Sequence, residues 1–255
     1  MVRVRTSREG ALALTERRLH VSDLPPEGGE VTLDAVASRH VRVLRLRPGD
    51  AVLLFDGRGQ EAQAEVQSVD ESVICMAKPS VTVEADGPRV VLVLGLPKGG
   101  TLDDCVRMAT ELGAHEVALL QAERSVPRWD EARTRSRVER LTRIAAEASA
   151  QCERSDVPTI HPPRSADQLF EAMPPGAGGV VFGARAERRF AIAEAPEQLW
   201  CAVGPEGGFS DPELRAFEAA GFEVASLGPT VLRVDTAVAA ALTVVGERMR
   251  SLQAR

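Results

Sequence analysis

A glycine-rich loop between a strand and a helix constrains this chain more than any other feature. The apolar residues 199–203 predict a buried strand, which runs directly into the segment GPEGGF at residues 204–209. Ser210 or Asp211 is suited to cap the helix that follows, and the first turn of that helix can accept Pro212. Open α/β sheets bind ligands at the carboxyl ends of their strands, and glycines let backbone groups approach a ligand closely. The loop therefore predicts an α/β fold with a ligand site.

Length and composition limit the class of protein. A chain of 255 residues suffices for one large domain or two ordinary ones. No apolar run approaches the roughly 18 residues of a membrane span and no signal peptide is expected, so we expect a cytoplasmic protein without a membrane partner. The four cysteines and four histidines are scattered, so neither a metal site nor a disulfide framework is predicted. We expect the thiols to be buried or incidental.

The net charge of −6 argues against a general nucleic-acid-binding protein, which is usually basic. The charge is unevenly distributed, because residues 124–154 carry eight arginines against five acidic residues, and residues 1–60 carry ten against eight. Arginine binds phosphates bidentately and stacks on bases, so this usage permits RNA binding. A general bias of the composition towards arginine explains it equally well, since only Lys78 and Lys98 are lysines.

The first 83 residues predict a small β-barrel. Apolar residues at helical spacing indicate a helix over 33–46, and residues 56–59 (DGRG) are typical of a hairpin turn. Short strands are predicted at 31–33, 51–55, 61–69 and 72–77. Several short strands with one helix favour a barrel. Residues 84–89, which include a Gly-Pro pair, are predicted to form a linker.

Beyond residue 89 the pattern changes to an alternation of strands and helices. Strands are predicted at 90–94, 117–120, 180–182, 199–203 and 224–227. Helices are predicted at 102–112, at 130–152 and from 235 to about 252, in addition to the one that follows residue 210. Such alternation predicts a parallel α/β sheet.

A second loop at residues 225–229 (ASLGP) ends another predicted strand and leads through residues 230–237 into the last helix. Together the two loops resemble those of the SPOUT class of S-adenosylmethionine-dependent RNA methyltransferases, and most closely those of the RsmE family. Further segments that match the family pattern lie at 38–50, 55–57, 95–100, 109–113, 123–125, 147–148, 151, 154 and 157–158. The resemblance implies an α/β protein with an N-terminal PUA-like RNA-binding β-barrel (residues 1–83), followed by a SPOUT-type domain with a C-terminal trefoil knot (residues 90–255).

The resemblance also implies an activity. Enzymes of the RsmE family use S-adenosyl-L-methionine to methylate N3 of one uridine in 16S ribosomal RNA. They act late in ribosome assembly, on small-subunit particles in preference to naked RNA, and they dimerise through the knotted domain. A homodimer that binds the small ribosomal subunit is therefore expected here.

By resemblance, backbone groups of the two glycine loops hold the cofactor in a bent conformation, and apolar side chains form walls around it. The residues that the resemblance assigns to cofactor binding are Phe182, Gly183, Gly204, Glu206, Gly207, Gly208, Leu227, Gly228, Val231, Leu232 and Val234. Without the resemblance, these glycines could simply form tight turns.

Arg233 and Asp235 flank Val234 at the mouth of the same expected site. Methylation at N3 requires loss of the N3 proton, which a carboxylate could accept or relay, while a guanidinium could stabilise charge on O2 or O4. We therefore expect Asp235 to be the proton acceptor or its orienter, and Arg233 its electrostatic partner. A helix-capping Asp beside an Arg is the alternative. The family usually has Thr-Glu at positions 234–235, so the carboxylate here is one methylene shorter.

Other basic residues are candidates for contact with RNA. Arg154, which matches a family arginine, is expected to clamp the target phosphate or base, in its own site or across a dimer; a solvated arginine at a helix terminus is the alternative. The remaining candidates are Arg39, His40, Arg42, Arg45, Lys98 and Arg124. On the predicted helix, Arg42 and Arg45 share a face while Val41 and Leu44 turn inward, although a solvated surface would look the same.

Binding of ATP or GTP is not expected, because residues 95–101 lack the Walker spacing. Two other functions stay open. A 2′-O-ribose RNA methyltransferase of the same superfamily would carry an early Asn-x-Gly-x3-Arg motif and a late Ser-Leu-Asn-Val-Ser motif, whereas this chain lacks the former and has Ser-Leu-Gly at 226–228. A non-catalytic RNA-binding assembly factor conflicts with the intact glycine loops, but Asp235 in place of Glu leaves it possible.

Overall fold

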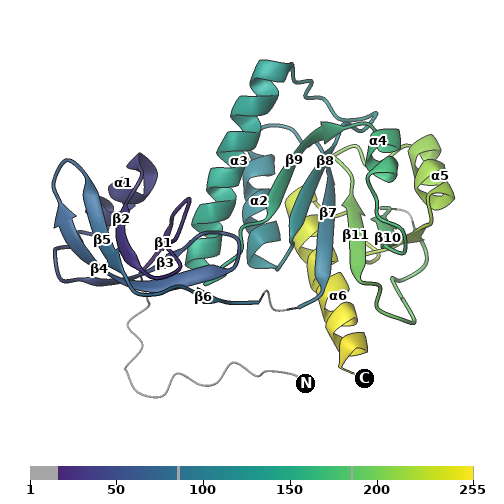
Figure 1. The fold of residues 1–255 in the computed structure, drawn as a ribbon. Coiled ribbons are helices and arrows are strands. Elements are labelled where there is room, and N and C mark those ends of the chain that lie inside the picture. Colours follow the sequence, from purple (N-terminus) through teal and green to yellow (C-terminus); the bar gives the residue numbers. More distant parts are fainter. Residues whose placement is uncertain (1–16, 85–86, 185, 255) are drawn as a thin grey trace. The chain divides into compact units, whose positions relative to one another are not determined.

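The computed structural model describes residues 17–84, 87–184 and 186–254, which fall into two compact units (Figure 1). The first unit contains the described residues up to 56 together with 60–83, and the second contains residues 57–59 and those from 84 onwards. Residues 85 and 86 of the predicted linker, and residues 1–16 of the predicted barrel, lie outside the described part. Arg89, the last residue of that predicted linker, is already the first residue of a strand.

The first unit is a six-stranded mixed sheet with one helix. Its strands are β1 (Arg18–His20), β2 (Gly29–Thr32), β3 (Ala51–Phe55), β4 (Gln60–Val69), β5 (Val73–Ala77) and β6 (Val81–Thr82), and its helix is α1 (Ala35–Val43). The hydrogen-bonded path runs β1-β3-β4-β5-β2, with β6 paired to β4. Among the strand pairs of this unit that the structure describes, only β1 and β3 are parallel. Fully buried Val41, Leu54, Val66 and Val73 form part of the core beneath α1.

The end of α1 differs from the prediction. The helix stops at Val43, and Arg45 adopts a left-handed conformation with φ of 55°. The N–H of Arg45 bonds the carbonyl of Arg42, and the N–H of Leu46 bonds that of Val41, which together form a Schellman motif. Arg45 therefore does not share a helical face with Arg42, and Leu46 takes the buried place that was predicted for Leu44, which is 38% exposed.

The second unit is a six-stranded sheet in which every pair is parallel, with the order β12-β10-β11-β7-β8-β9. Its strands are β7 (Arg89–Gly95), β8 (Glu116–Leu120), β9 (Thr159–Arg164), β10 (Gly178–Phe182), β11 (Gln198–Val203) and β12 (Phe222–Ala225). Its helices are α2 (Thr101–Glu111), α3 (Glu131–Gln151), α4 (Ala166–Glu171), α5 (Asp211–Ala219) and α6 (Val234–Gln253). The predicted parallel α/β sheet is confirmed.

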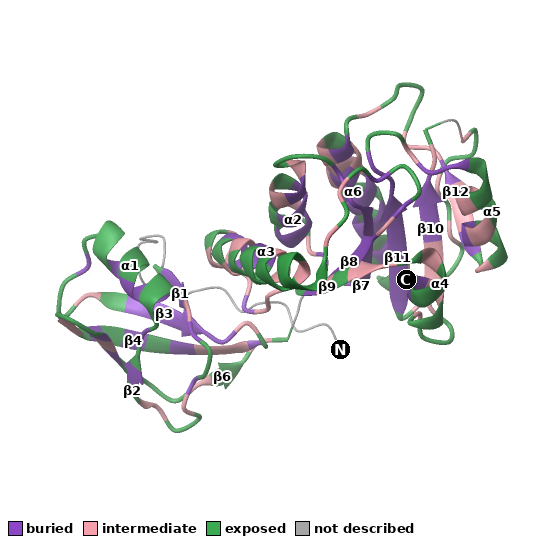
Figure 2. Ribbon diagram, turned by 90° about the horizontal axis from the view of Figure 1, so that it is seen from above, coloured by how far each residue is buried: buried purple, intermediate pink, exposed green. Residues whose placement is uncertain are grey.

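Both faces of this sheet are covered, because successive residues of a strand point to opposite faces. On β7, Leu92 and Leu94 pack with α2, α3 and α6, while Val91 and Val93 pack with residues of α4 and α5. The strands are consequently buried between two helical layers, as Figure 2 shows. None of the helices in the described ranges is long and apolar enough to cross a membrane.

Candidate functional site

The carboxyl ends of the parallel strands bring the predicted ligand loops together. The register pairs Phe182 with Val203 and with Ala225, and Val203 with Leu94. The loops that follow β7, β10, β11 and β12 therefore leave the sheet along one edge. Since β11 lies between β7 and β10, the glycine loop at 204–209 is the central one of these loops.

The glycine loop folds back on itself. The N–H of Gly208 donates to the carbonyl of Pro205 at 2.8 Å, and Gly208 has a positive φ of 65°. A Cβ on Gly204 would lie 3.1 Å from the Cα of Gly208, so a side chain at 204 would press on the returning backbone. Ser210 then caps α5 in a capping box with Glu213, which confirms Ser210 rather than Asp211 as the cap.

The loop after β7 braces the glycine loop from one side. Gly95 approaches so closely that a Cβ on it would lie 2.6 Å from Cδ of Pro205. The N–H of Lys98 donates to Oε1 of Glu206 at 2.9 Å. The carboxylate of Glu206, which was predicted only as part of a cofactor loop, thus joins two loops, while the side chain of Lys98 is left exposed.

The loop after β8 braces the glycine loop through Arg124. Its Nη1 donates to the carbonyl oxygens of Gly207, at 2.8 Å, and of Phe209, at 3.4 Å. Next to it, the N–H of Glu123 donates to Oε1 of Glu213 at 2.8 Å. Arg124 was predicted as an RNA contact, whereas the structure gives its guanidinium two bonds to the candidate cofactor loop.

The loop after β12 carries the second set of predicted cofactor residues. The hydroxyl of Ser226 bonds both the N–H and the carbonyl of Gly228, whose φ is 142°. Val231 is 79% exposed and Leu232 is half-buried. Val234 is different, because it is buried in the core beneath α6 and does not line the loop surface.

On the neighbouring strand, Phe182 is 8% exposed at the end of β10, and the N–H of Gly183 donates to the carbonyl of Ala225 at 3.0 Å. This bond continues the β10–β12 pairing by one residue. The segment predicted as a further wall is thereby held next to the start of the loop after β12.

Arg233 and Asp235 lie together at the start of α6. Arg233 is the N-cap residue, with its side chain 83% exposed, and its Nε lies 3.8 Å from Oδ1 of Asp235. That oxygen also accepts the N–H of Thr236 at 2.8 Å. Asp235 is thus inside the first turn and is not the helix cap that was the alternative reading of its sequence position.

Cys105 of α2 belongs to the same core cluster as Val234, at the start of α6, and Val203, which precedes the glycine loop. Burial, followed by the nearby carboxylates of Asp235, Asp104 and Glu206, raises the pKa of the Cys105 thiol to about 12. Cys105 lies in α2, which begins directly after the loop that holds Glu206. The pKa of this thiol thus responds to carboxylates from α2, from the glycine loop and from α6.

Arg154 is not part of this arrangement within one chain. Its guanidinium bonds the carboxylate of Asp156 through two nitrogens, and its Nη1 donates to the carbonyl of Thr110 at 2.6 Å. Thr110 lies near the carboxyl end of α2, whereas Cys105, the neighbour of Asp235, lies in its first half. Arg154 is accordingly at the amino-terminal edge of the sheet, away from Asp235.

The candidate RNA residues of the first unit have different surroundings. Arg39 and His40 are exposed on α1. Arg42 uses Nη2 to bond the carbonyl of Asp70 at 2.7 Å and that of Glu71 at 3.3 Å, so part of its guanidinium stabilises the β4–β5 turn. Arg45 projects from the left-handed position after the helix. The four residues therefore do not form one helical face.

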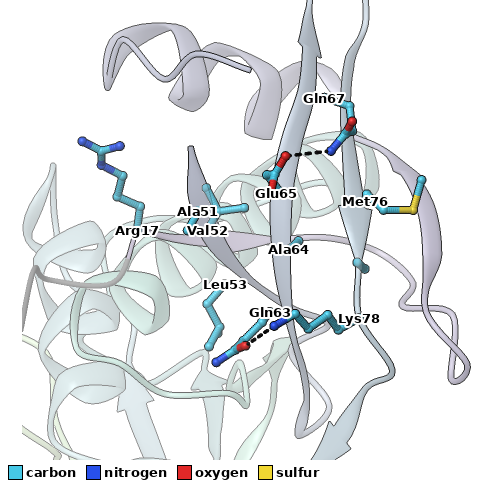
Figure 3. A pocket seen from close by; sticks show the side chains of 11 residues that line it. Arg17, Ala51, Val52, Leu53, Gln63, Ala64, Glu65, Gln67, Met76 and Lys78 are labelled. Atoms are coloured by element: carbon cyan, nitrogen blue, oxygen red, sulfur yellow. Dashed lines mark hydrogen bonds between the residues drawn. The ribbon is translucent and has the colours of Figure 1, made fainter. Parts of the chain in front are cut away.

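Two cavities of the described residues lie away from the glycine loops. One, of about 430 Å³, lies on the sheet of the first unit between Arg17 and Lys78, where Nζ of Lys78 donates to Oε1 of Gln63 at 3.1 Å (Figure 3). The other, of about 680 Å³, lies at the amino-terminal edge of the second sheet and is lined by Glu116 and Trp200.

Titratable side chains give no sign of a metal centre. Within the described ranges, no group of three or more His, Cys, Asp or Glu residues could hold a metal ion. Cys75, Cys105 and Cys201 are buried free thiols, as predicted, and Cys152 is partly buried. Burial raises the pKa of Cys75 to about 11.

Comparisons with known proteins agree with this architecture. A family described as "RNA methyltransferase domain" matches residues 85–246, and one described as "RNA methyltransferase PUA domain" matches residues 33–74. The fold and the loop arrangement thus define a protein of the RNA methyltransferase class.

Two relatives carry the name ribosomal RNA small subunit methyltransferase E. The protein from Mycobacterium bovis is 32% identical, over 89% of this chain and 90% of the relative, and that from Bacillus subtilis is 31% identical, over 84% and 88%. This chain belongs to the RsmE family of RNA methyltransferases.

Solved structures give the same result for the fold. A methyltransferase from Legionella pneumophila, in complex with the bound cofactor SAM, has a TM-score of 0.84 and 27% identity, over 90% of this chain and 96% of that one. Ribosomal RNA small subunit methyltransferase E from Neisseria gonorrhoeae, bound to S-adenosyl methionine, has a TM-score of 0.83 and 24% identity over the same shares.

Proposed function

We propose that this protein uses S-adenosyl-L-methionine to methylate N3 of one uridine in 16S ribosomal RNA, within the small ribosomal subunit. The observation that carries the proposal is the braced glycine loop at 204–209, which leaves the same carboxyl edge of the parallel sheet as the loop that leads to Arg233 and Asp235. Membership of the RsmE family supports ribosomal RNA as the substrate. The choice of N3 and the action late in assembly follow the chemistry of that family.

The glycine loops fit a cofactor that binds through backbone groups. No atom lies within 4 Å of a Cβ built on Gly208 or Gly228, so space beside the backbone is open in both loops. The exposed Val231 is available to cover an apolar part of a ligand. Bound S-adenosylmethionine supplies an electrophilic methyl group. Gly204 and Gly207 keep the loop compact beneath it, because a side chain at either position would press on neighbouring atoms.

Asp235 and Arg233 have different roles at the target base: one in proton transfer, the other in stabilising charge. Asp235 takes the N3 proton or orients the group that takes it, since its carboxylate is 27% exposed and fixed by the N–H of Thr236. Arg233 stabilises the negative charge that loss of this proton places on O2 or O4, because its guanidinium is exposed and 3.8 Å from the carboxylate. The base nitrogen is then ready to accept the methyl group.

The enzyme acts as a homodimer in this proposal. Arg154 lies at the opposite edge from Asp235 in its own chain, so it can act as a clamp on RNA only in the site of a second copy. α6 leaves Val244 43% exposed, beside Thr243, which is also exposed. The resemblance to the RsmE family, whose members dimerise through this domain, supports the homodimer.

The test is to incubate the protein with labelled S-adenosylmethionine and unmodified small subunits, and to locate the methyl group by mass spectrometry of digested RNA. One 3-methyluridine in 16S RNA is the expected product. A ribose methyl group would replace the proposal with the 2′-O-methyltransferase alternative. No methyl group on subunits, naked ribosomal RNA or transfer RNA, despite cofactor binding, would mean that the substrate is different.

A further inference from the structure

The first half of α3 packs against the core much less than its second half does. The helix has 21 residues, but its buried residues are Leu141, Ala145, Ala148 and Ser149, all in the second half. No residue from 131 to 140 is buried. Helices in proteins are stabilised mainly by the burial of one face. In the three turns before Leu141, Val138 packs against the core while only partly buried, so most of this part of the helix is not held by burial.

Arginines on this extension form one stripe. Arg133, Arg137, Arg140 and Arg143 follow one another at spacings of four, three and three residues, which places them along one side of the helix. At about 1.5 Å per residue the stripe is roughly 15 Å long. Arg135 lies on the opposite side, where it pairs with Glu131.

The stripe is not used for internal ion pairs. In the described part of the chain, the guanidinium groups of Arg133, Arg137 and Arg143 make no hydrogen bond or ion pair. Arg140 alone is paired, with Asp103 in the first turn of α2. Residues 124–143 hold seven arginines against three acidic residues, although the whole chain has a net charge of −6. Positive charge is thus concentrated on this face against the overall balance.

The stripe borders the candidate methyltransferase site. α3 follows the loop in which Arg124 bonds Gly207, so its first turn is close in sequence to a residue that touches the glycine loop. The pairing of Arg140 with Asp103 holds the stripe against the start of α2, and α2 begins directly after the loop of Lys98. Figure 1 shows α2 and α3 side by side. A polymer bound at the glycine loops could continue along the stripe.

We propose that Arg133, Arg137 and Arg143 form a docking surface for the phosphate backbone of ribosomal RNA that flanks the target nucleotide. The inference rests on the proposed function. Arginine forks match phosphate geometry, and backbone contacts of this kind fix the position of a nucleic acid without reading its sequence. The surface holds the RNA so that the target base reaches Asp235.

The test compares two triple variants of the full-length protein. R133A/R137A/R143A removes the surface. R107A/R135A/R250A is the matched control, because it removes the same charge from three exposed arginines, each in a local surface ion pair. Binding to a 16S RNA fragment and to small subunits is measured from 50 to 300 mM salt. Cofactor affinity is measured by calorimetry.

The expected result is that the surface variant binds RNA at least tenfold more weakly than the control at about 150 mM salt. A plot of the logarithm of the RNA-binding constant against the logarithm of the salt concentration should become less steep by about two. Each lost phosphate contact lowers the magnitude of this slope by roughly 0.7–0.9. Cofactor affinity and the rate at saturating RNA should stay unchanged. Equal RNA affinity and equal slope in both variants would overturn the inference even if the wild type makes 3-methyluridine. A surface-dependent slope with a different methylated product would overturn the proposed reaction alone.

Discussion

Arg124 donates a hydrogen bond from Nη1 to the carbonyl oxygen of Gly207 at 2.8 Å, although the two residues are 83 positions apart in the chain. The contact is also a packing contact, because a Cβ on Gly207 would lie 3.1 Å from Cβ of Arg124. The shape of the glycine loop therefore depends on a side chain from a different strand-end loop. Arg124 therefore stabilises the conformation of the glycine loop, in addition to any contact that it makes with RNA.

Replacing Arg124 by alanine should loosen the glycine loop. One charged hydrogen bond at a solvent-exposed position is worth about 1 kcal/mol, so we expect S-adenosylmethionine to bind roughly five- to tenfold more weakly. Calorimetric titration measures this directly, with R107A as the control on a surface arginine outside the site. If the alanine variant binds the cofactor as tightly as wild type but binds RNA more weakly, Arg124 contacts RNA and does not support the glycine loop.

Gly95, the last residue of β7, and Gly100, the residue that precedes α2, offer a matched pair. A Cβ on Gly95 would lie 2.6 Å from Pro205, whereas no atom lies within 4 Å of a Cβ on Gly100. G95A should therefore displace Pro205 and destabilise the protein by about 1–3 kcal/mol, while G100A should change stability by only a few tenths. Thermal unfolding and cofactor titration of both variants test this. Similar melting temperatures for G95A and G100A would show that the stability of the fold does not depend on the close approach of Gly95 to Pro205.

Asp235 should matter for turnover more than for binding. Loss of a general base lowers rates by about 10²–10⁴, so D235N should reduce kcat about 100-fold or more while cofactor affinity stays the same. The residual rate of D235N should rise with pH, because only uracil that has already lost its N3 proton can then react. D235E, which restores the usual family carboxylate, should remain active. If D235A keeps full turnover while R233A abolishes it, Asp235 is not the base.

Arg154 should contribute to stability. Burial raises the pKa of Asp156, but the hydrogen bonds and charge of Arg154 outweigh it and hold that pKa below its usual value. R154A leaves this partly buried carboxylate without its partner and removes the bond to Thr110, so we expect a loss of about 2 kcal/mol. For a chain of this size the melting temperature should fall by roughly 4–8 °C. The double variant R154A/D156N should recover part of the loss. An unchanged melting temperature with weakened RNA binding would identify Arg154 as a clamp.

Glu116 should make the free energy of unfolding depend on pH in the acid range. Hydrogen bonding to His161, helped by Arg89 and opposed by burial, lowers the pKa of Glu116 to about 2. A lowered carboxyl pKa stabilises the fold fully above its value in the unfolded chain, near 4.5, and this contribution disappears as the pH falls towards 2. E116Q should therefore be less stable than wild type at pH 7, and the difference should narrow between about pH 4.5 and 2. Urea unfolding across this range measures it; a constant difference would contradict the prediction.

Strong local patterns allowed most of the fold to be predicted. The continuous apolar run of β7 and the capped start of α5 are both confirmed within a residue or two. β9 was missed because it contains Pro162 and Pro163, which disfavour a strand and are tolerated here because β9 is an edge strand. β1 and β6 are too short to show alternation, and six-residue α4 is too short to show helical periodicity. The trefoil knot and the homodimer stay predictions.

The candidate site was predicted as a set of loops, but not as a set of contacts. Arg124 was predicted as an RNA contact from the match of residues 123–125 to the family pattern, because the sequence does not show which loop its side chain reaches. Glu206 was predicted to contribute through its backbone, whereas its carboxylate bonds the N–H of Lys98. The prediction that Arg42 and Arg45 share a helical face was wrong, because the helix has already ended at Arg45. Arg45 adopts a left-handed conformation, which a non-glycine residue rarely takes and which the sequence did not indicate.

The sequence by itself determined the elements, the parallel sheet and the position of the glycine loops, because these depend on local periodicity, capping and turn residues that act over a few positions. Only the tertiary structure decided what each loop touches. Gly95 against Pro205, Lys98 with Glu206 and Arg124 with Gly207 are pairs formed between the ends of different strands. Strand order sets these neighbours, and it results from the packing of whole helices and strands, which no local pattern in the chain encodes.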